Sequence, residues 1–312
     1  MNDAPQPMQA DSLPPDTSLG PVRLAVSDLD RSLAWYGSVL GLETLSPLEA
    51  DPGDSGAERR ETLGVAGGQG AQDQPVQNQG VSGTPLVHLE EHPGVRPVSP
   101  RSRLGLFHFA ILLPERADLG RLVRHLTEMD VPFGAADHAV SEALYLQDPD
   151  GLGVEVYVDR PRDQWRFRGD ELVMTTEPLD LADLEQTGTG GRWRSIPAGS
   201  VMGHIHLHTG DLERANTFYH GHLGFDRMVW SYPGALFLSA GGYHHHLGLN
   251  TWARDASPAG PGDARLIEWE VRVPGTLEAL LARLERAGCR VQRTADGGRA
   301  EDPWGTAVRF RG

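Results

Sequence analysis

The chain has 312 residues, of which 39% are hydrophobic and 23% charged, so it can build a core without disulfide support. Its net charge of −15 argues against nucleic acid as a partner, because affinity for phosphate depends on Lys and Arg. Cys289 is the single cysteine, no apolar run approaches the roughly 18 residues of a membrane helix, and no signal-peptide pattern is visible, which favours a cytoplasmic protein without a membrane partner.

Three polar stretches divide the chain. Residues 1–18, rich in Pro, Asp and Gln, are predicted to be a disordered tail. Residues 51–83, rich in Gly, Gln and Asp, are predicted to be an inserted loop with short strand structure near Glu61–Val65. Residues 161–199, most clearly Thr187–Gly199, are predicted to be a linker.

A first repeat lies between these stretches. The segment GPVRLAVSDLDRSLAWYGSVLGLETL, from residue 20, matches GHIHLHTGDLERANTFYHGHLGFDRM, from residue 203, in its Asp-Leu, aromatic-Tyr and Leu-Gly pairs. Each copy begins with alternating apolar and polar residues, which predicts a half-buried strand. Asp28 or Asp211 is placed to cap the following helix, and Gly41 or Gly224 is placed to end it.

A second repeat follows each copy of the first. The segment LFHFAILLPERADLGRLVRHLTEMDVPF matches LIEWEVRVPGTLEALLARLERAGCRV, with Pro114 aligned to Pro274. Each copy reads as a strand, a helix and further strands. The copies end in QDPDGLGVEVY and EDPWGTAVRF, where Asp-Pro-x-Gly predicts a turn before a final strand.

The repeats predict an α+β fold of four βαβββ modules, numbered 1 to 4 along the chain. Each module is a small curved sheet with one helix, and two modules face to face form an open barrel around a cavity. The chain therefore holds two open barrels. The predicted modules cover residues 19–97 (with the 51–83 insertion), 103–160, 200–253 and 263–311.

Side chains that bind metals gather at matching strand positions of modules 2 and 3. They are His108, Glu155 and His204, and His244–His246 are predicted to lie on the last strand of module 3. A single strand histidine is more often an ordinary polar residue than a ligand. Two imidazoles and one carboxylate on one face, however, form the facial triad that leaves open positions on Fe(II) for a substrate and dioxygen.

Modules 1 and 4 depart from this pattern. Module 1 has Pro21 in place of the histidine, and module 4 has Arg309 in place of the carboxylate. We therefore expect modules 2 and 3 to form the metal barrel across the linker, and modules 1 and 4 to form a barrel without metal. His88 and Glu268 are metal-type residues left in the second barrel, and they are interpreted as structural or solvent-facing.

The segment HAVSEALYLQDPDGLGVE, from His138 to Glu155, resembles the signature of extradiol ring-cleavage dioxygenases. It contains the His, an apolar-Tyr pair, Asp-Pro-x-Gly and a following Glu, and the one departure from the signature is Ala136, two residues before the His. The segment GHIHLHTGDLERANTFYHGHLGF is similar to a module of the vicinal-oxygen-chelate superfamily. The resemblance covers nearly all the chain outside the tail and the insertion, and is strongest to two-domain bacterial catechol 2,3-dioxygenases.

The resemblance implies roles for individual residues. Glu155, His108 and His204 would be the metal ligands. His138 and Tyr145 would hydrogen-bond the substrate or an oxygenated intermediate. The segment HHHLGL resembles the part of the family that carries the acid–base histidine, which implies this role for His245, with His246 as the competing residue.

The implied activity is Fe(II)-dependent cleavage of a catecholic ring by O2, with Mn(II) as the alternative metal. A glyoxalase-like lyase or isomerase, with His246 as a fourth metal ligand, is an alternative within the same fold. A non-enzymatic protein that binds a small aromatic compound is another alternative. The sequence leaves open the ring substituents, the metal, the role of residues 51–83 and the oligomeric state, including a homo-oligomer.

Overall fold

The chain folds into four βαβββ units, as the repeats predict, in a computed structural model that describes residues 12–45, 59–66 and 83–312. Module 1 comprises β1 (Ser18–Val26), α1 (Leu29–Trp35), β2 (Glu43–Leu45), β3 (Arg60–Ala66) and β4 (Gly83–Glu91). Module 2 comprises β5 (Gly105–Leu112), α2 (Arg116–Glu128), β6 (Gly134–Asp137), β7 (Ser141–Gln147) and β8 (Gly153–Asp159). Module 3 comprises β11 (Val201–His208), α4 (Leu212–Asn216), β12 (Asp226–Val229), β13 (Ala235–Ser239) and β14 (Leu247–Asn250). Module 4 comprises β15 (Arg265–Arg272), α5 (Leu277–Arg286), β16 (Val291–Thr294), β17 (Gly297–Glu301) and β18 (Ala307–Arg311).

The helices of modules 1 and 3 begin and end where the sequence predicts. The Asp28 side chain accepts a hydrogen bond from the third residue of α1, and Asp211 does the same for α4. Both helices continue as short π-helical segments, Tyr36–Leu40 and Thr217–His222. Gly41 (φ 71°) and Gly224 (φ 86°) then adopt the left-handed conformation that ends the helix.

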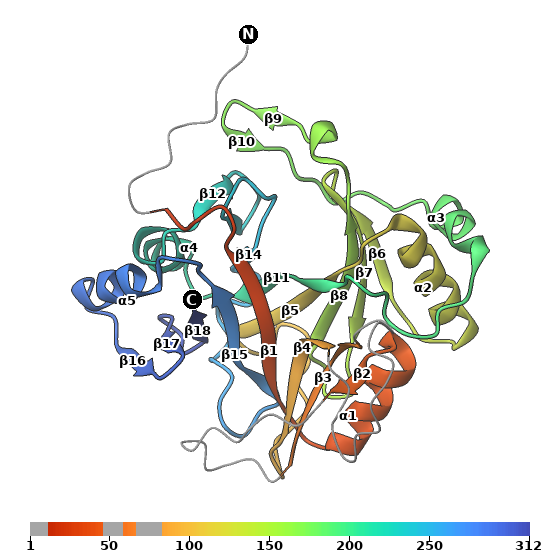
Figure 1. The fold of residues 1–312 in the computed structure, drawn as a ribbon, viewed down its shortest axis with the longest axis horizontal. Coiled ribbons are helices and arrows are strands. Elements are labelled where there is room, and N and C mark those ends of the chain that lie inside the picture. The colour runs from red at the N-terminus through yellow and green to blue at the C-terminus, as the bar shows by residue number, and fades with distance from the viewer. Residues whose placement is uncertain (1–11, 46–58, 67–82) are drawn as a thin grey trace, which may run out of the picture.

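The strands form two eight-stranded sheets (Figure 1). One has the order β16-β17-β18-β15-β1-β4-β3-β2 and joins modules 4 and 1; we call it the 1–4 sheet. The other has the order β12-β13-β14-β11-β5-β8-β7-β6, joins modules 3 and 2, and is called the 2–3 sheet. Antiparallel pairing of β1 with β15 and of β5 with β11 makes the junctions. The predicted pairing of modules 2 with 3 and 1 with 4 is therefore confirmed.

Two buried Tyr–Asp hydrogen bonds connect the sheets at equivalent places. The Tyr36 hydroxyl in module 1 donates to Asp148 in module 2 at 3.1 Å, and Tyr219 in module 3 donates to Asp302 in module 4 at 3.0 Å. Both aspartates open the predicted Asp-Pro-x-Gly turns. Burial raises the pKa of Asp148 to about 7 and also raises that of Asp302. The same Tyr–Asp contact thus joins module 1 to module 2 and module 3 to module 4.

The predicted disordered tail is wrong for its last residues. Leu13 is buried, and its N–H donates to the carbonyl of Gly224 at 2.8 Å. The strand expected near Glu61–Val65 is confirmed as β3. The remaining parts of these two predictions, residues 1–11 and most of the 51–83 insertion, lie outside the described residues. No helix in the described part of the chain is long and apolar enough to span a membrane.

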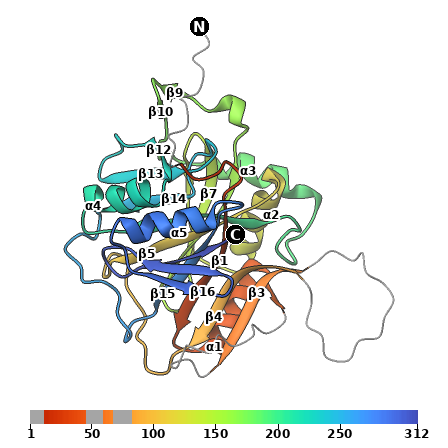
Figure 2. The same ribbon diagram turned by 60° about the vertical axis from the view of Figure 1, so that its left-hand side comes forward.

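The segment predicted as a linker contains secondary structure and closes the 2–3 sheet. It contains a 3₁₀ turn (Arg162–Gln164), the β9–β10 hairpin (Phe167–Arg168 and Glu171–Leu172), α3 (Leu181–Thr187) and a second 3₁₀ turn (Gly188–Gly190). We call residues 161–177 the strap. It pairs with edge strand β6 through an Asp137–Glu177 bridge, and Glu171 accepts the N–H of Trp230, just beyond edge strand β12, at 2.6 Å. The hairpin projects beyond the sheets above β12 (Figure 2).

Candidate metal centre

Three neighbouring strands of the 2–3 sheet, β8, β5 and β11, position the candidate ligands. Ala110 on β5 pairs with Glu155 on β8 and with His204 on β11. His108 lies two residues earlier on β5, so its side chain points to the same face as Ala110. Because Ala110 is fully buried and has the smallest side chain with a Cβ, the side chains on either side can reach across it toward His108.

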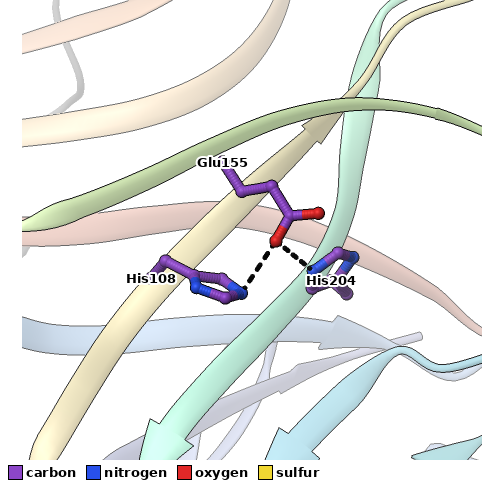
Figure 3. Close-up of side chains that lie close together, drawn as sticks. All are labelled: His108, Glu155 and His204. Atoms are coloured by element: carbon purple, nitrogen blue, oxygen red, sulfur yellow. Dashed lines mark hydrogen bonds and ion pairs between the residues drawn. The ribbon is translucent and has the colours of Figure 1, made fainter. Parts of the chain in front are cut away.

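The side chains of His108, Glu155 and His204 converge on one point (Figure 3). Glu155 Oε2 lies 3.0 Å from His108 Nε2 and 3.2 Å from His204 Nε2. All three residues are buried, and each offers a ligand atom within 4.8 Å of the others. The structure thus brings together residues from both halves of the chain, as the predicted barrel of modules 2 and 3 requires.

The charges of this cluster suit a cation. Burial alone would raise the pKa of Glu155, but His204 and His108 hold it well below its usual range, so the carboxylate is ionised. Burial lowers the pKa of His108, against the opposing pull of Glu155, which favours the neutral imidazole. An ionised carboxylate and neutral imidazoles are the protonation states that bind metals.

The geometry also fits a metal ion. His108 Nδ1, His108 Nε2 and His204 Nδ1 are buried and lack an aligned hydrogen-bond partner among the described residues. Leaving such an atom unsatisfied costs about 1–3 kcal/mol, and a ligand for Nε2 removes part of that cost. Two donor atoms at right angles around an ion, with bonds of about 2.1 Å, lie about 3.0 Å apart. The observed separations of 3.0 and 3.2 Å match this arrangement.

His138 and Tyr145 form a hydrogen-bonded pair beside the ligand set. The Tyr145 hydroxyl lies 2.5 Å from His138 Nε2, and its ring centroid is 5.5 Å from that of His108. His138 Nδ1 lies 2.7 Å from the carbonyl of Thr175 in the strap. A carbonyl only accepts, so Nδ1 carries the hydrogen and a neutral His138 accepts from Tyr145. Burial and the nearby Glu155 raise the pKa of Tyr145 well above its usual value, which keeps the hydroxyl protonated.

The three consecutive histidines lie in a turn before β14, so their expected place on the strand is wrong. The His245 ring packs against His204, with centroids 4.1 Å apart. His246 points elsewhere: its Nδ1 accepts the N–H of Ala240 at 3.2 Å and lies 3.0 Å from Ser239 Oγ. Burial lowers the pKa of His246 to about 3. The structure therefore brings His245, and not His246, to the ligand set.

Two left-handed glycines shape this turn. Gly241 (φ 62°) and Gly242 (φ 66°) precede the histidines and break the alternation on which strand prediction depends. A Cβ on Gly241 would collide with the backbone of Pro15. The ordered residues 12–17 thus pack directly on the turn that presents His245.

Sequence reasoning missed several groups in the barrel. His206 and His208 follow His204 at alternate positions of β11 and face the same interior, where the Asn250 side chain lies 2.9 Å from His206 Nε2 and 2.7 Å from His208 Nδ1. The alternation of the three histidines was visible in the sequence. A solvent-facing strand edge would show the same pattern, so it did not identify the barrel wall.

The equivalent positions of the 1–4 sheet hold ion pairs. Glu268, on β15, lies 3.5 Å from Arg23 and 3.4 Å from Arg309. His88 lies 3.1 Å from Thr62 Oγ1, and burial lowers its pKa to about 3. Of the two interpretations, structural or solvent-facing, these contacts support the structural one for both residues.

The fold and the barrel site define the class of protein. Residues 18–156 and 201–310 match the glyoxalase/bleomycin resistance protein/dioxygenase superfamily, and the chain belongs to that superfamily. A catechol-2,3-dioxygenase of Bacillus subtilis (strain 168) is 39% identical to this chain over 298 residues, which are 94% of this chain and 96% of the relative. The resemblance seen in the sequence is thereby confirmed.

Solved structures agree on the fold. A putative dioxygenase from Bacillus subtilis subsp. subtilis str. 168 superposes with a TM-score of 0.62 at 14% identity, covering 97% of this chain and 86% of that one. Glyoxalase I from Zea mays gives a TM-score of 0.51 at 17% identity, covering 95% and 92% of the two chains. At these identities the matches establish the architecture alone.

Proposed function

We propose that the protein is an Fe(II)-dependent extradiol dioxygenase, which uses O2 to open a catecholic ring beside its two hydroxyl groups. The observation that carries the proposal is the buried cluster of His108, Glu155 and His204, which has the donor set of a 2-His-1-carboxylate triad. The relative that is 39% identical, a catechol-2,3-dioxygenase, supports this activity.

Fe(II) is the proposed metal, with Mn(II) as the alternative, because both accept imidazole and carboxylate ligands. His108, Glu155 and His204 would hold it from one side and leave its other positions for small molecules. When bound, the metal would bring the diol and O2 together and supply the redox chemistry that dioxygen requires.

The surrounding side chains would move protons and orient the ring. His245 would take the proton of one catechol hydroxyl, because its ring lies against that of the ligand His204. Burial and the neighbouring imidazoles hold the pKa of His245 well below its usual range, so it is neutral and able to accept. Because the Tyr145 hydroxyl donates its one hydrogen to His138, its oxygen would accept a hydrogen bond from a hydroxyl of the bound diol.

The contacts of His246 favour this activity over a glyoxalase-like lyase or isomerase. That alternative was based on a fourth protein ligand from His246, which instead bonds Ala240 and Ser239. Within the described residues, His108, Glu155 and His204 form the one cluster with metal-ligand spacing. A binding protein without activity and a glyoxalase-like enzyme would both consume no oxygen, so oxygen uptake distinguishes the proposed dioxygenase from either.

Oxygen uptake tests the proposal. Full-length protein reconstituted anaerobically with Fe(II) should consume O2 stoichiometrically with a catechol, from a panel with alkyl, aryl and carboxyl substituents, and release a ring-opened product. Glu155→Gln should abolish uptake. His88→Phe, a change in the other barrel, should leave it intact. No uptake with any catechol in protein that retains Fe(II) would overturn the proposal.

A further inference from the structure

A chain of hydrogen bonds leads from His245 away from the ligand set. His245 Nδ1 lies 2.6 Å from His244 Nδ1, and His244 Nε2 lies 2.8 Å from Asp159 Oδ1. The same carboxylate oxygen accepts the hydroxyl of Tyr243 at 3.0 Å, and that hydroxyl lies 2.7 Å from Tyr157. The mechanism proposed above does not use His244, Asp159 or either tyrosine.

Packing holds this chain of hydrogen bonds in place. His244 is completely buried, whereas the Asp159 side chain is 29% exposed, so the series of hydrogen bonds runs from the barrel interior toward solvent. The His244 ring packs against three aromatic rings, with centroid distances of 4.1 Å to Tyr243, 5.4 Å to Trp165 of the strap and 6.0 Å to Tyr157. A buried side chain that packs against these rings and is hydrogen-bonded at both ring nitrogens has little freedom to rotate.

The hydrogen bonds fix which nitrogen carries each proton. An ionised carboxylate only accepts, so the bond to Asp159 requires the hydrogen on His244 Nε2. A neutral imidazole that carries its hydrogen on Nε2 has a lone pair on Nδ1, so His244 Nδ1 is the acceptor. The 2.6 Å contact then requires the hydrogen on His245 Nδ1, and His245 Nε2 keeps its lone pair.

We propose that Asp159 and His244 are positioning residues that hold His245 in the tautomer with a free lone pair on Nε2. This nitrogen has no hydrogen-bond partner among the described residues, while the ring lies against His204. The tautomer follows from the contacts alone, and its effect on turnover rests on the proposed function.

The proton balance is simple. A catechol O–H bond breaks and an Nε2–H bond forms on His245, which gives a catecholate and an imidazolium. The imidazolium keeps the hydrogen bond from its Nδ1–H to His244, which in turn is hydrogen-bonded to the Asp159 carboxylate. The new positive charge is therefore connected to a negative group through two hydrogen bonds.

Nitrogen NMR tests the tautomer without requiring activity. Full-length, metal-free protein labelled with ¹⁵N-histidine is measured at pH 8, and the His245 signals are assigned by their loss in His245→Phe. We expect a protonated Nδ1 and an unprotonated Nε2, with a shift toward the Nε2–H form in Asp159→Ala. An Nε2-protonated His245 in the unmodified protein would overturn the proposal.

Kinetics of the Fe(II)-loaded protein test the consequence with a matched pair of variants. His244→Asn keeps an acceptor oxygen near the position of Nδ1, whereas His244→Leu has a similar size and no acceptor. We expect His244→Leu to lower kcat at least about tenfold with KM within about threefold, and His244→Asn to retain most of kcat.

Equal losses in both variants, at equal metal content and Tm, would show a packing role and overturn the assignment. Unchanged kcat in His244→Leu would do the same. If the unmodified protein turns over no catechol, the proposed function fails, and the NMR measurement still decides the tautomer.

Discussion

Replacing Glu155 by Gln separates metal binding from stability. The carboxylate is buried and ionised, and its two imidazole neighbours share one of its oxygens. Gln has nearly the same shape but no charge. Without metal, the change should alter stability little, because the lost attraction to the two imidazoles is offset by the removal of a buried charge. With metal, the site loses its anionic ligand.

The expected size follows from mass action. A divalent ion at about 1,000 times its Kd adds about 4 kcal/mol to the free energy of unfolding. For a chain of this length each kcal/mol is worth about 2 °C in Tm, so the metal should raise Tm by about 8 °C. In Glu155→Gln the shift at the same metal concentration should fall below about 2 °C.

Thermal unfolding under nitrogen, with EDTA or with Fe(II) or Mn(II), measures both effects. Glu268→Gln is the matched control in the other barrel. It removes a buried carboxylate that lies 3.4–3.5 Å from Arg23, Arg299 and Arg309, so it should lower Tm in EDTA and keep the full metal shift. A metal shift in Glu155→Gln equal to that of the unmodified protein would refute the assignment of Glu155 as a ligand.

His245→Phe should retain metal and lower kcat about 10²-fold or more, as oxygen uptake and metal analysis will show. His246→Phe should instead lower Tm in thermal unfolding and leave kcat close to that of the unmodified protein. The pKa of Asp148, raised from 3.8 to about 7, means that the folded state holds a proton that the unfolded state has lost. This group's contribution to stability should therefore fall as pH rises from about 4 to about 7, and urea unfolding of Asp148→Asn should lack that component. Gly203→Ala would push its methyl into the Tyr157 hydroxyl and should cost about 1–3 kcal/mol in the same assay, and an unchanged value would contradict the packing.

The sequence predicts the architecture well because repeats can be compared with one another. Four strand–helix–strand patterns in two matching pairs lead to the modules. Pro21 and Arg309 at the candidate ligand positions then indicate which modules share the candidate metal barrel. These inferences use only residue type at matched positions, which does not depend on the coordinates of any single side chain.

The rest of the site depends on distant backbone contacts. The strap carries a short hairpin with weak periodicity, and only its hydrogen bonds to residues at two sheet edges show that it closes the barrel. The orientation of His245 depends on consecutive left-handed glycines, Gly241 and Gly242, of which Gly241 packs against Pro15. Asp159 lies at the end of β8, 85 positions from its partner His244. No local pattern encodes contacts of this kind.

The two barrels meet the same electrostatic requirement in different ways. Each interior buries a carboxylate near the middle of its sheet, and a buried carboxylate needs a positive partner. In the 1–4 sheet Arg309, at the position equivalent to Glu155, lies 3.4 Å from Glu268 and provides that charge. In the 2–3 sheet the neighbours of Glu155 are imidazoles, which burial keeps neutral in the case of His108. The chain itself therefore supplies a cation to one barrel, and under the proposed function the other barrel takes its cation from solution.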